Sequence, residues 1–262
     1  MFDYHLHSSV SFDSESSAES IAIAARQQGL REICFTDHCD YNSDKTKTHY
    51  PIDLAEYDAA YGSLEVNGLS IKRGFEFGLT DWNRPELQAM LNSRPFDFVI
   101  GSVHFVDGFD PYDREYWIDK TEREAYLGYL ERILECIKIH DGFDVLGHLT
   151  YVSRSVYNPT KNLLEYRDYS DICDEIFKVL IRKDKGIEIN TSAVGTLGVL
   201  LPSYDFVKRF HELGGKIVTV GSDAHSPERV GQHIDKALKL AKEVFGYVCT
   251  FEKREPIFNK IR

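Results

Sequence analysis

The stretch FDYHLH, residues 2–7, is a short run of strand-forming residues that ends in histidine. Similar apolar runs recur along the chain, and each is followed by a longer segment with the periodicity of an amphipathic helix. The seven predicted strands cover residues 2–6, 32–36, 70–77, 96–103, 144–147, 186–190 and 216–221. Strands that alternate with helices favour a parallel sheet. The pattern therefore predicts an α/β fold built as a closed or nearly closed (β/α) barrel, with an open doubly wound sheet as the alternative.

Several helix ends carry recognisable signals. Ser16 and Glu19 have the spacing of a capping box, and Gly29 supplies the stop of that first helix. Apolar residues on one face predict a helix over residues 122–140. Ser226 and Pro227 are typical of a helix start and predict a last long helix that runs to about residue 245.

Composition limits the class of protein. The chain has 262 residues, of which 42% are hydrophobic and 13% aromatic, so it is too apolar to be disordered. Its 31 Lys and Arg against 42 Asp and Glu give a net charge of −11, which disfavours a nucleic-acid partner. No linker or low-complexity tract interrupts the chain, so one domain over residues 1–262 is expected. Five scattered cysteines and the lack of a leader or an 18-residue apolar run predict a cytoplasmic protein with no membrane partner.

Six of the seven predicted strands deliver a metal-competent side chain at the carboxyl end, where barrel enzymes build their active sites. With Asp13 from the loop after the first strand, the candidate metal ligands are His5, His7, Asp13, His38, Glu76, His104, His148, Asp223 and His225. Residues two apart in a strand share a face, so His5 and His7 are expected to point together while Phe2, Tyr4 and Leu6 face the other way. Imidazole and carboxylate ligands suit Zn, Mn or Fe.

The number of candidate ligands exceeds what one tetrahedral ion needs, which indicates two or three divalent ions with Glu76 as a natural bridge. Three ions bring about +6, while Asp13, Glu76, Asp223 and a bridging hydroxide bring about −4. The remainder of about +2 matches a small phosphate monoester dianion. An acidic protein therefore need not repel such a substrate.

Each motif also has a structural interpretation. The pair Asp37-His38 is compatible with a turn and a helix cap, and an HxH sequence near a chain start is a weak signal. Unpaired buried groups such as Glu76 and His148 are harder to explain as structure alone, because their burial is costly. What favours a metal centre is the joint placement of the candidates on one rim. Four other histidines do not lie on this rim and are predicted to be surface residues or to pack in the scaffold: His49, His140, His211 and His233.

Other groups near the rim are candidates for substrate contacts. Arg154 lies six residues after His148 and is expected to bind phosphate, with a solvated surface arginine as the alternative. Asn190, Thr191 and Ser192 end a strand without a ligand, so they either bind substrate or turn the chain. The long loop 105–119 holds acidic and aromatic candidates for the remainder of the substrate: Phe105, Asp107, Phe109, Asp110, Tyr112 and Trp117. These residues are equally compatible with lid packing.

In order along the chain, the motifs resemble those of the PHP family, named for polymerase and histidinol phosphatase. They are HLH at His5 to His7, TDH ending at His38, GFEFG around Glu76, GSVH ending at His104, GH at His148, EINTS from Glu188 and GSDAHSPERVG from Gly221. The likeness covers essentially the whole chain. Thr150 and Ala193 depart from the common family pattern, where Asp and Gly are frequent, and neither departure removes a ligand.

This resemblance implies a single distorted, TIM-like (β/α)7 barrel with a trinuclear metal site. Its ligand groups, transferred to this chain, are His5, His7, Glu76 and Asp223 for one ion, Glu76, His104 and His148 for a second, and Asp13, His38 and His225 for the third. It also implies hydrolysis of L-histidinol phosphate, in histidine biosynthesis, by a hydroxide held between two ions. Arg154 is expected to stabilise charge in the transition state, and Asp223 or His225 to move a proton.

Three rival functions stay open at the level of sequence. One is a related phosphoesterase that acts on nucleotides, nucleic-acid ends or phosphotyrosine. Another is an amidohydrolase-type C–N hydrolase, although no predicted strand ends in the lysine that often bridges metals in such enzymes. The third is a degenerate binding module, which would be expected to have lost ligands. The sequence indicates neither which metals bind nor an oligomeric state.

Overall fold

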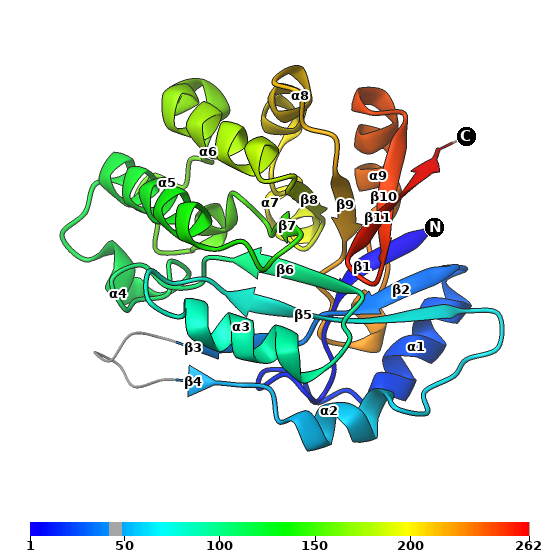
Figure 1. The fold of residues 1–262 in the computed structure, drawn as a ribbon. Coiled ribbons are helices and arrows are strands. Elements are labelled where there is room, and N and C mark those ends of the chain that lie inside the picture. The colour runs from blue at the N-terminus through cyan, green and yellow to red at the C-terminus, as the bar shows by residue number, and fades with distance from the viewer. Residues whose placement is uncertain (42–48, 262) are drawn as a thin grey trace.

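The computed structural model describes residues 1–41 and 49–261, and it has helices arranged around a nearly closed barrel of parallel strands (Figure 1). The strands are β1 Phe2–Leu6, β2 Glu32–Phe35, β3 His38–Tyr41, β4 His49–Tyr50, β5 Ser70–Gly78, β6 Phe98–Ser102, β7 Val145–Leu146, β8 Gly186–Asn190, β9 Val218–Gly221, β10 Tyr247–Glu252 and β11 Glu255–Lys260. The α-helices are α1 Ala18–Gln27, α2 Leu54–Tyr61, α3 Arg84–Ser93, α4 Arg114–Trp117, α5 Glu122–Ile139, α6 Ser170–Arg182, α7 Val194–Leu197, α8 Tyr204–Glu212 and α9 Ile234–Val244. The predicted (β/α) barrel is confirmed, and the doubly wound alternative is wrong.

Seven parallel positions make up the barrel wall, in the order β1-β2-β5-β6-β7-β8-β9. The second position is interrupted, because β2 pairs with the first half of β5 and β3 pairs with its second half, where His38 faces Glu76. The barrel closes where β1 meets the end of β9, through a parallel bridge between Leu6 and Ala224. There the amide of Asp223 donates to the carbonyl of His5 at 2.8 Å. Closure brings the first and last candidate ligands of the chain together.

The lower end of the barrel lumen, where the strands begin, is apolar. The antiparallel hairpin of β10 and β11 covers this end, and Phe251 packs on Phe98 with ring centroids 4.8 Å apart. Tyr4 joins the same layer, and its hydroxyl accepts from the amide of Phe251 at 3.0 Å and donates to Glu32 at 2.6 Å. The layer consists of Tyr4, Cys34, Phe98, Ile100, Val145, Cys249 and Phe251. Burial of this apolar surface stabilises the barrel from within.

The prediction that Tyr4 points away from His5 is wrong. The pairing of β1 with β2 shifts between Asp3 and Leu6, as at a β-bulge. A bulge inserts a residue and breaks the strict alternation of faces. Tyr4 therefore belongs to the apolar lumen layer, His5 lies just above it, and Leu6 packs into the outer core with the helices.

Two predicted helix starts also need correction. The N-cap of α1 is Ser17 rather than Ser16, because Ser16 is held in the preceding loop, where its carbonyl accepts from the amide of Ser9 at 2.7 Å. Ser226 and Pro227 open only a short 3₁₀ turn, Pro227–Arg229. The last long helix begins at Ile234, because the chain turns at Gly231, with φ +68°, and at His233, with φ +62°.

Helix α5 matches its prediction closely, and its capping box is formed by Thr121 and Glu124. All five cysteines are buried and form no disulfide. Within residues 1–41 and 49–261, none of the helices combines the length and the apolar character needed to cross a membrane.

Candidate metal centre

Glu76 is the centre of the polar upper end of the lumen. It is fully buried on β5, between two core phenylalanines, Phe75 and Phe77, that point outward. Its Oε2 lies 3.1 Å from His5 Nε2 and 3.1 Å from His38 Nδ1. Each of these imidazoles comes from a different strand, so the carboxylate joins β1, β3 and β5.

The second oxygen of Glu76 faces β6 and β7. Its Oε1 lies 2.9 Å from His148 Nε2 and 3.3 Å from His104 Nε2, and it accepts from the Ser102 hydroxyl at 2.5 Å. Burial opposes ionisation of Glu76, but the neighbouring histidines, above all His5 and His104, hold its pKa well below the usual range. A carboxylate with imidazoles on both oxygens has the geometry expected of a bridging ligand.

Asp223 completes the first predicted ligand group at the end of β9. Its Oδ1 lies 3.4 Å from His7 Nε2 and 3.8 Å from His5 Nε2. The residue adopts φ +55°, a left-handed conformation that Asp tolerates better than most residues and that turns its side chain into the lumen. Burial again opposes ionisation, and His5, His7 and Arg154 hold the pKa of Asp223 well below its usual range.

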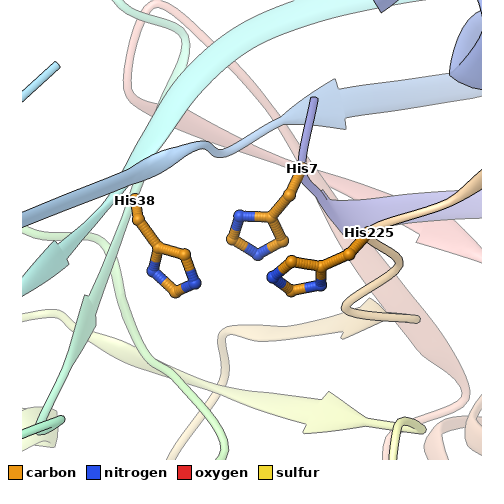
Figure 2. Close-up of side chains that lie close together, drawn as sticks. All are labelled: His7, His38 and His225. Atoms are coloured by element: carbon orange, nitrogen blue, oxygen red, sulfur yellow. The ribbon is translucent and has the colours of Figure 1, made fainter. Parts of the chain in front are cut away.

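Three imidazoles meet at the mouth of the lumen, where His7 stacks on the other two, and Figure 2 shows His7, His38 and His225 converging from three separate segments. The ring of His7 lies 4.0 Å from that of His225 and 4.3 Å from that of His38. Burial, together with the two neighbouring rings, holds the pKa of His7 well below its usual value. Asp13 Oδ2 reaches His225 Nε2 at 3.1 Å and His38 Nε2 at 3.5 Å from the loop after β1.

These residues fit a cluster of metal ions. The Nε2 atom of His7 is buried and has no hydrogen-bond partner among the described residues. Buried polar atoms nearly always have a hydrogen-bond partner or a ligand, so this nitrogen is available to coordinate a metal ion. Donor atoms within 4.8 Å of one another form four overlapping groups, including His5, His7 and Asp223. Nitrogen and carboxylate oxygen together are the ligands of Zn, Mn or Fe sites.

The upper end of the lumen opens into a small cavity of about 140 Å³. Besides candidate ligands, its walls include Arg154, Tyr151, Asp110 and Phe12. Arg154 Nη1 lies 3.3 Å from Asp223 Oδ2, and the side chain is 27% exposed. The volume is below the range of about 300–1,000 Å³ for drug-sized ligands, so the cavity suits a small head group.

The comparisons with known proteins agree with this geometry. A family model described as PHP domain matches residues 3–192. The chain belongs to the PHP domain family. The histidinol-phosphatase of Lactococcus lactis is 34% identical over 98% of this chain and 97% of that protein, and a probable histidinol-phosphatase of Clostridium acetobutylicum is 32% identical over 97% and 98%. A crystal structure of the Lactococcus histidinol phosphate phosphatase, complexed with Zn, L-histidinol and phosphate, superposes with a TM-score of 0.86 and covers 98% of both chains at 32% identity.

Sequence reasoning missed three carboxylates that orient histidines in this PHP domain. Glu188 Oε1 lies 2.6 Å from His5 Nδ1, and its Oε2 accepts from the amide of His148 at 2.9 Å. Asp40 Oδ1 lies 2.9 Å from His104 Nδ1. Second partners of this type fix the tautomer and orientation of a ligating histidine. The sequence GIEIN of β8 places Glu188 and Asn190 on the same face of the strand, and this alternation could have indicated the role of Glu188.

The third carboxylate, Asp37, supports His7 indirectly. Asp37 is fully buried and accepts hydrogen bonds from the amide of Ser8, from Ser11 Oγ at 2.9 Å and from the hydroxyl of Tyr61. Ser11 Oγ in turn lies 3.1 Å from His7 Nδ1. Asp37, in the turn between β2 and β3, therefore positions His7 through Ser11.

The remaining candidates divide between the site and the scaffold of the PHP domain. Asp110 and Phe105 line the cavity. Asp107 instead pairs with Arg132 at 2.9 Å, and the indole of Trp117 is buried and donates to the carbonyl of Pro111. Phe109 and Tyr112 are exposed. Asn190 donates to Glu188 and weakly to Asp223, so it orients the acids.

The four histidines assigned to surface or packing lie outside this cavity. His140 ends α5 and its Nε2 faces the carbonyl of Thr80 at 2.7 Å. His211 and His233 belong to the segments of α8 and α9, and His49 lies in β4 rather than in a loop.

Proposed function

We propose that the chain is a metal-dependent phosphomonoesterase that hydrolyses L-histidinol phosphate to L-histidinol and phosphate. The observation that carries the proposal is one cavity whose walls hold six predicted metal ligands together with a guanidinium and a separate carboxylate, those of Arg154 and Asp110. Similarity over the whole chain to a histidinol phosphate phosphatase that binds Zn, L-histidinol and phosphate supports it.

Three ions would be held by the ligand groups predicted above. His5, His7, Glu76 and Asp223 would hold one ion. Donor atoms of His5, His7 and Asp223 lie within 4.8 Å of one another, and Glu76 Oε2 lies 3.1 Å from His5 Nε2. Glu76, His104 and His148 would hold a second ion, and the last predicted group is Asp13, His38 and His225. When bound, such ions polarise phosphoryl oxygens and lower the pKa of water, which makes a nucleophile available at neutral pH.

Arg154 would bind the phosphoryl group. Its guanidinium faces the cavity beside Asp223, and its central carbon lies 5.5 Å from the centre of the Tyr151 ring, a cation–π contact that helps to hold it there. A planar guanidinium grips two phosphate oxygens at once and adds positive charge where the transition state gathers negative charge.

Asp223 is better placed than His225 to move the proton. His225 Nδ1 lies 3.1 Å from the carbonyl oxygen of Asp223, which favours a proton on Nδ1 and leaves Nε2 as a ligand atom. Asp223 directs one oxygen to the histidines, whereas Oδ2 faces Arg154. This Oδ2 would take a proton from the attacking water and return it to the leaving alkoxide.

Asp110 would select the substrate by its ammonium group. Its carboxyl is half-buried, and it accepts from the amide of Tyr112 at 2.7 Å and from the Tyr151 hydroxyl at 3.1 Å. Burial raises the pKa of Asp110 although His104 lies near enough to oppose the shift, and no lysine or arginine among the described residues forms an ion pair with Asp110. A cationic amine beside this carboxyl would offset the cost of burying its charge. The exposed ring of Phe12, stacked on Tyr50 at 3.9 Å, offers a face for the substrate imidazole.

The test compares kcat/KM for L-histidinol phosphate, AMP, phosphotyrosine and a 5′-phosphorylated oligonucleotide on enzyme of counted metal content. A preference for histidinol phosphate of about 100-fold or more is expected. Asp110→Asn should lower kcat/KM about 10-fold or more for histidinol phosphate and leave that for phenyl phosphate, which has no amine, nearly unchanged. Asp107→Asn, in the same loop but outside the cavity, is the matched control. A flat substrate profile would exclude histidinol phosphate as the preferred substrate.

A further inference from the structure

A second cavity lies at the opposite end of the barrel from the metal centre. It is bounded by the residues that precede β7, β8 and β9 and by the hairpin of β10 and β11, and its volume is about 460 Å³. That volume lies within the usual range for small-molecule sites, about 300–1,000 Å³. The apolar lumen layer of Phe98, Ile100 and Val145 separates it from Glu76. A ligand in this cavity would therefore not contact the metal centre.

Four cationic side chains line the cavity, and two of them have partners. Lys183 Nζ lies 2.7 Å from Asp141 and also donates to the carbonyls of Lys138 and His140. The guanidinium of Arg254 binds both oxygens of Asp144, at 2.5 and 2.8 Å. These two cations have structural roles: Lys183 binds the carboxyl end of α5, and Arg254 attaches the hairpin to the segment before β7.

The other two cations, Lys185 and Lys216, have no such partner. No carboxylate among the described residues lies within 4.0 Å of either ammonium group. Lys185 is half-buried with its Nζ 5.7 Å from the centre of the Phe143 ring, and burial lowers its pKa. Asp144 and Asp141 attract this ammonium group, but neither forms an ion pair with it, and the partial burial of an amine is unfavourable in the fold alone.

The register of the sheet makes this arrangement more costly. Ile187 pairs with Val218 across β8 and β9, and Lys185 and Lys216 each lie two residues before these paired positions, in the segments that lead into the two strands. The two lysines therefore precede neighbouring strands, and repulsion between the half-buried Lys185 and the exposed Lys216 is unfavourable. An anion between them would remove both penalties at once.

We propose that this cavity binds a small organic anion. A phosphate or carboxylate head would lie between the ammonium groups of Lys185 and Lys216, and an apolar body would pack against Ile217, Phe251 and Phe258 at the hairpin. Three carboxylates also line the cavity. Asp144 is paired with Arg254, whereas Asp184 and Glu255 are exposed, as Lys216 is, so solvent screens their charge. The site is independent of the substrate proposed for the metal centre.

The test uses 1-anilinonaphthalene-8-sulfonate, an amphiphilic anion that is not a phosphate ester, with the metal-loaded protein. We expect saturable fluorescence with one site per chain and a Kd that rises about tenfold or more in the double variant Lys185→Met, Lys216→Met. Methionine keeps the apolar stem, so a purely hydrophobic site would survive the change. The matched control, Lys236→Met with Lys239→Met, removes the same charge from exposed positions on α9 and should leave the Kd unchanged.

Competition then identifies the head group. Methylphosphonate and succinate should displace the probe, and the one that acts at lower concentration indicates whether the natural ligand carries a phosphate or carboxylates. Arg154→Met should leave the Kd unchanged, because that residue lies at the other end of the barrel. An unaltered Kd in the lysine double variant, loss of binding in Arg154→Met, or failure of both competitors at tens of millimolar would overturn the proposal.

Discussion

The two ends of the barrel lumen are equally buried and chemically opposite. The lower end holds rings and aliphatic chains such as Tyr4, Phe98 and Phe251, and the upper end holds Glu76 and His5, each with no exposed surface. The same strands build both layers: β6 supplies Phe98 below and Ser102 above. Apolar burial stabilises the lower layer without any partner, whereas buried carboxylates and imidazoles are costly until a cation balances them. The lower end therefore carries stability, and the upper end carries chemistry.

The largest expected effect is at the upper end. Glu76→Gln keeps the shape of the side chain but removes the charge that faces His5, His38, His104 and His148. We expect kcat/KM to fall by about 1,000-fold or more, with a parallel loss of bound metal. Mutating a residue that only hydrogen-bonds to a metal ligand typically costs about 10- to 100-fold. Kinetics and elemental analysis of the purified protein check this. Glu131→Gln, an exposed change, should alter neither, and a fully active Glu76→Gln enzyme would contradict the metal centre.

The matching change at the lower end should affect stability instead. Phe251→Ala leaves a cavity beside Phe98 and Tyr4 and should lower the free energy of unfolding by about 3–5 kcal/mol. The kcat/KM of the protein that remains folded should stay within about twofold, because Phe251 does not line the catalytic cavity. Urea denaturation and kinetics measure the two quantities. Phe258→Ala, at a ring that is 52% exposed, is the control and should cost much less.

A third change separates orientation from ligation within the upper end. Glu188→Gln places an amide where two oxygens now face His5 Nδ1 and the amide of His148. We expect a 10- to 100-fold loss of metal affinity or kcat/KM, with a fold as stable as the wild type once metal is saturating. Metal titration of the apo protein followed by calorimetry gives the affinity, and Glu243→Gln serves as an exposed control. If affinity is unchanged, Glu188 has only a structural role.

Chelation should make the contrast visible in one protein. Removal of metal should abolish turnover and lower the Tm, since a ligand present at about 1,000 times its Kd stabilises the folded state by about 4 kcal/mol. The same chelator treatment should change the Tm of Glu76→Gln much less, because that variant has already lost metal. Differential scanning calorimetry of both proteins with and without chelator checks this. Turnover that survives exhaustive chelation would exclude metal-dependent hydrolysis.

The smallest expected effect concerns Asp3, a buried residue of β1. Its carboxylate accepts from the amide and hydroxyl of Ser222 and from the amide of Gly231, and burial raises its pKa from 3.8 to about 6. A raised pKa in the folded state means that the protonated form is favoured by folding. The contribution of Asp3 to stability is therefore present below pH 3.8 and is lost as the pH rises through about 6.

Asp3→Asn removes this titration. Between pH 4 and pH 7.5 the wild type should lose roughly 1–3 kcal/mol of stability relative to the variant. Urea denaturation of both proteins after chelation isolates the difference, since the other titrating groups are common to the two. Parallel pH profiles for the two proteins would show that Asp3 does not titrate in this range.

The sequence predicted most of the architecture for a simple reason. Strand and helix periods are local, so all seven strands and the α5 helix could be located from short windows such as 186–190 and 122–140. The errors arose where long-range contacts overrode local signals. Ser226 and Pro227 look like a helix start, but Gly231 donates to Asp3, more than 200 residues away, and the chain turns before α9 begins.

The candidate ligands were also accessible from the sequence, because parallel strands place their carboxyl ends on one rim whatever their exact register. The sequence by itself therefore determined the barrel and the set of nitrogen and oxygen donors around it. Only the tertiary structure decided which oxygen of Glu76 meets which imidazole, that Glu188 and Asp40 orient His5 and His104, and that Lys185 and Lys216 line one cavity beneath the barrel. Those contacts depend on barrel closure and on a bulge in β1, and both arise from pairing between segments far apart in the chain.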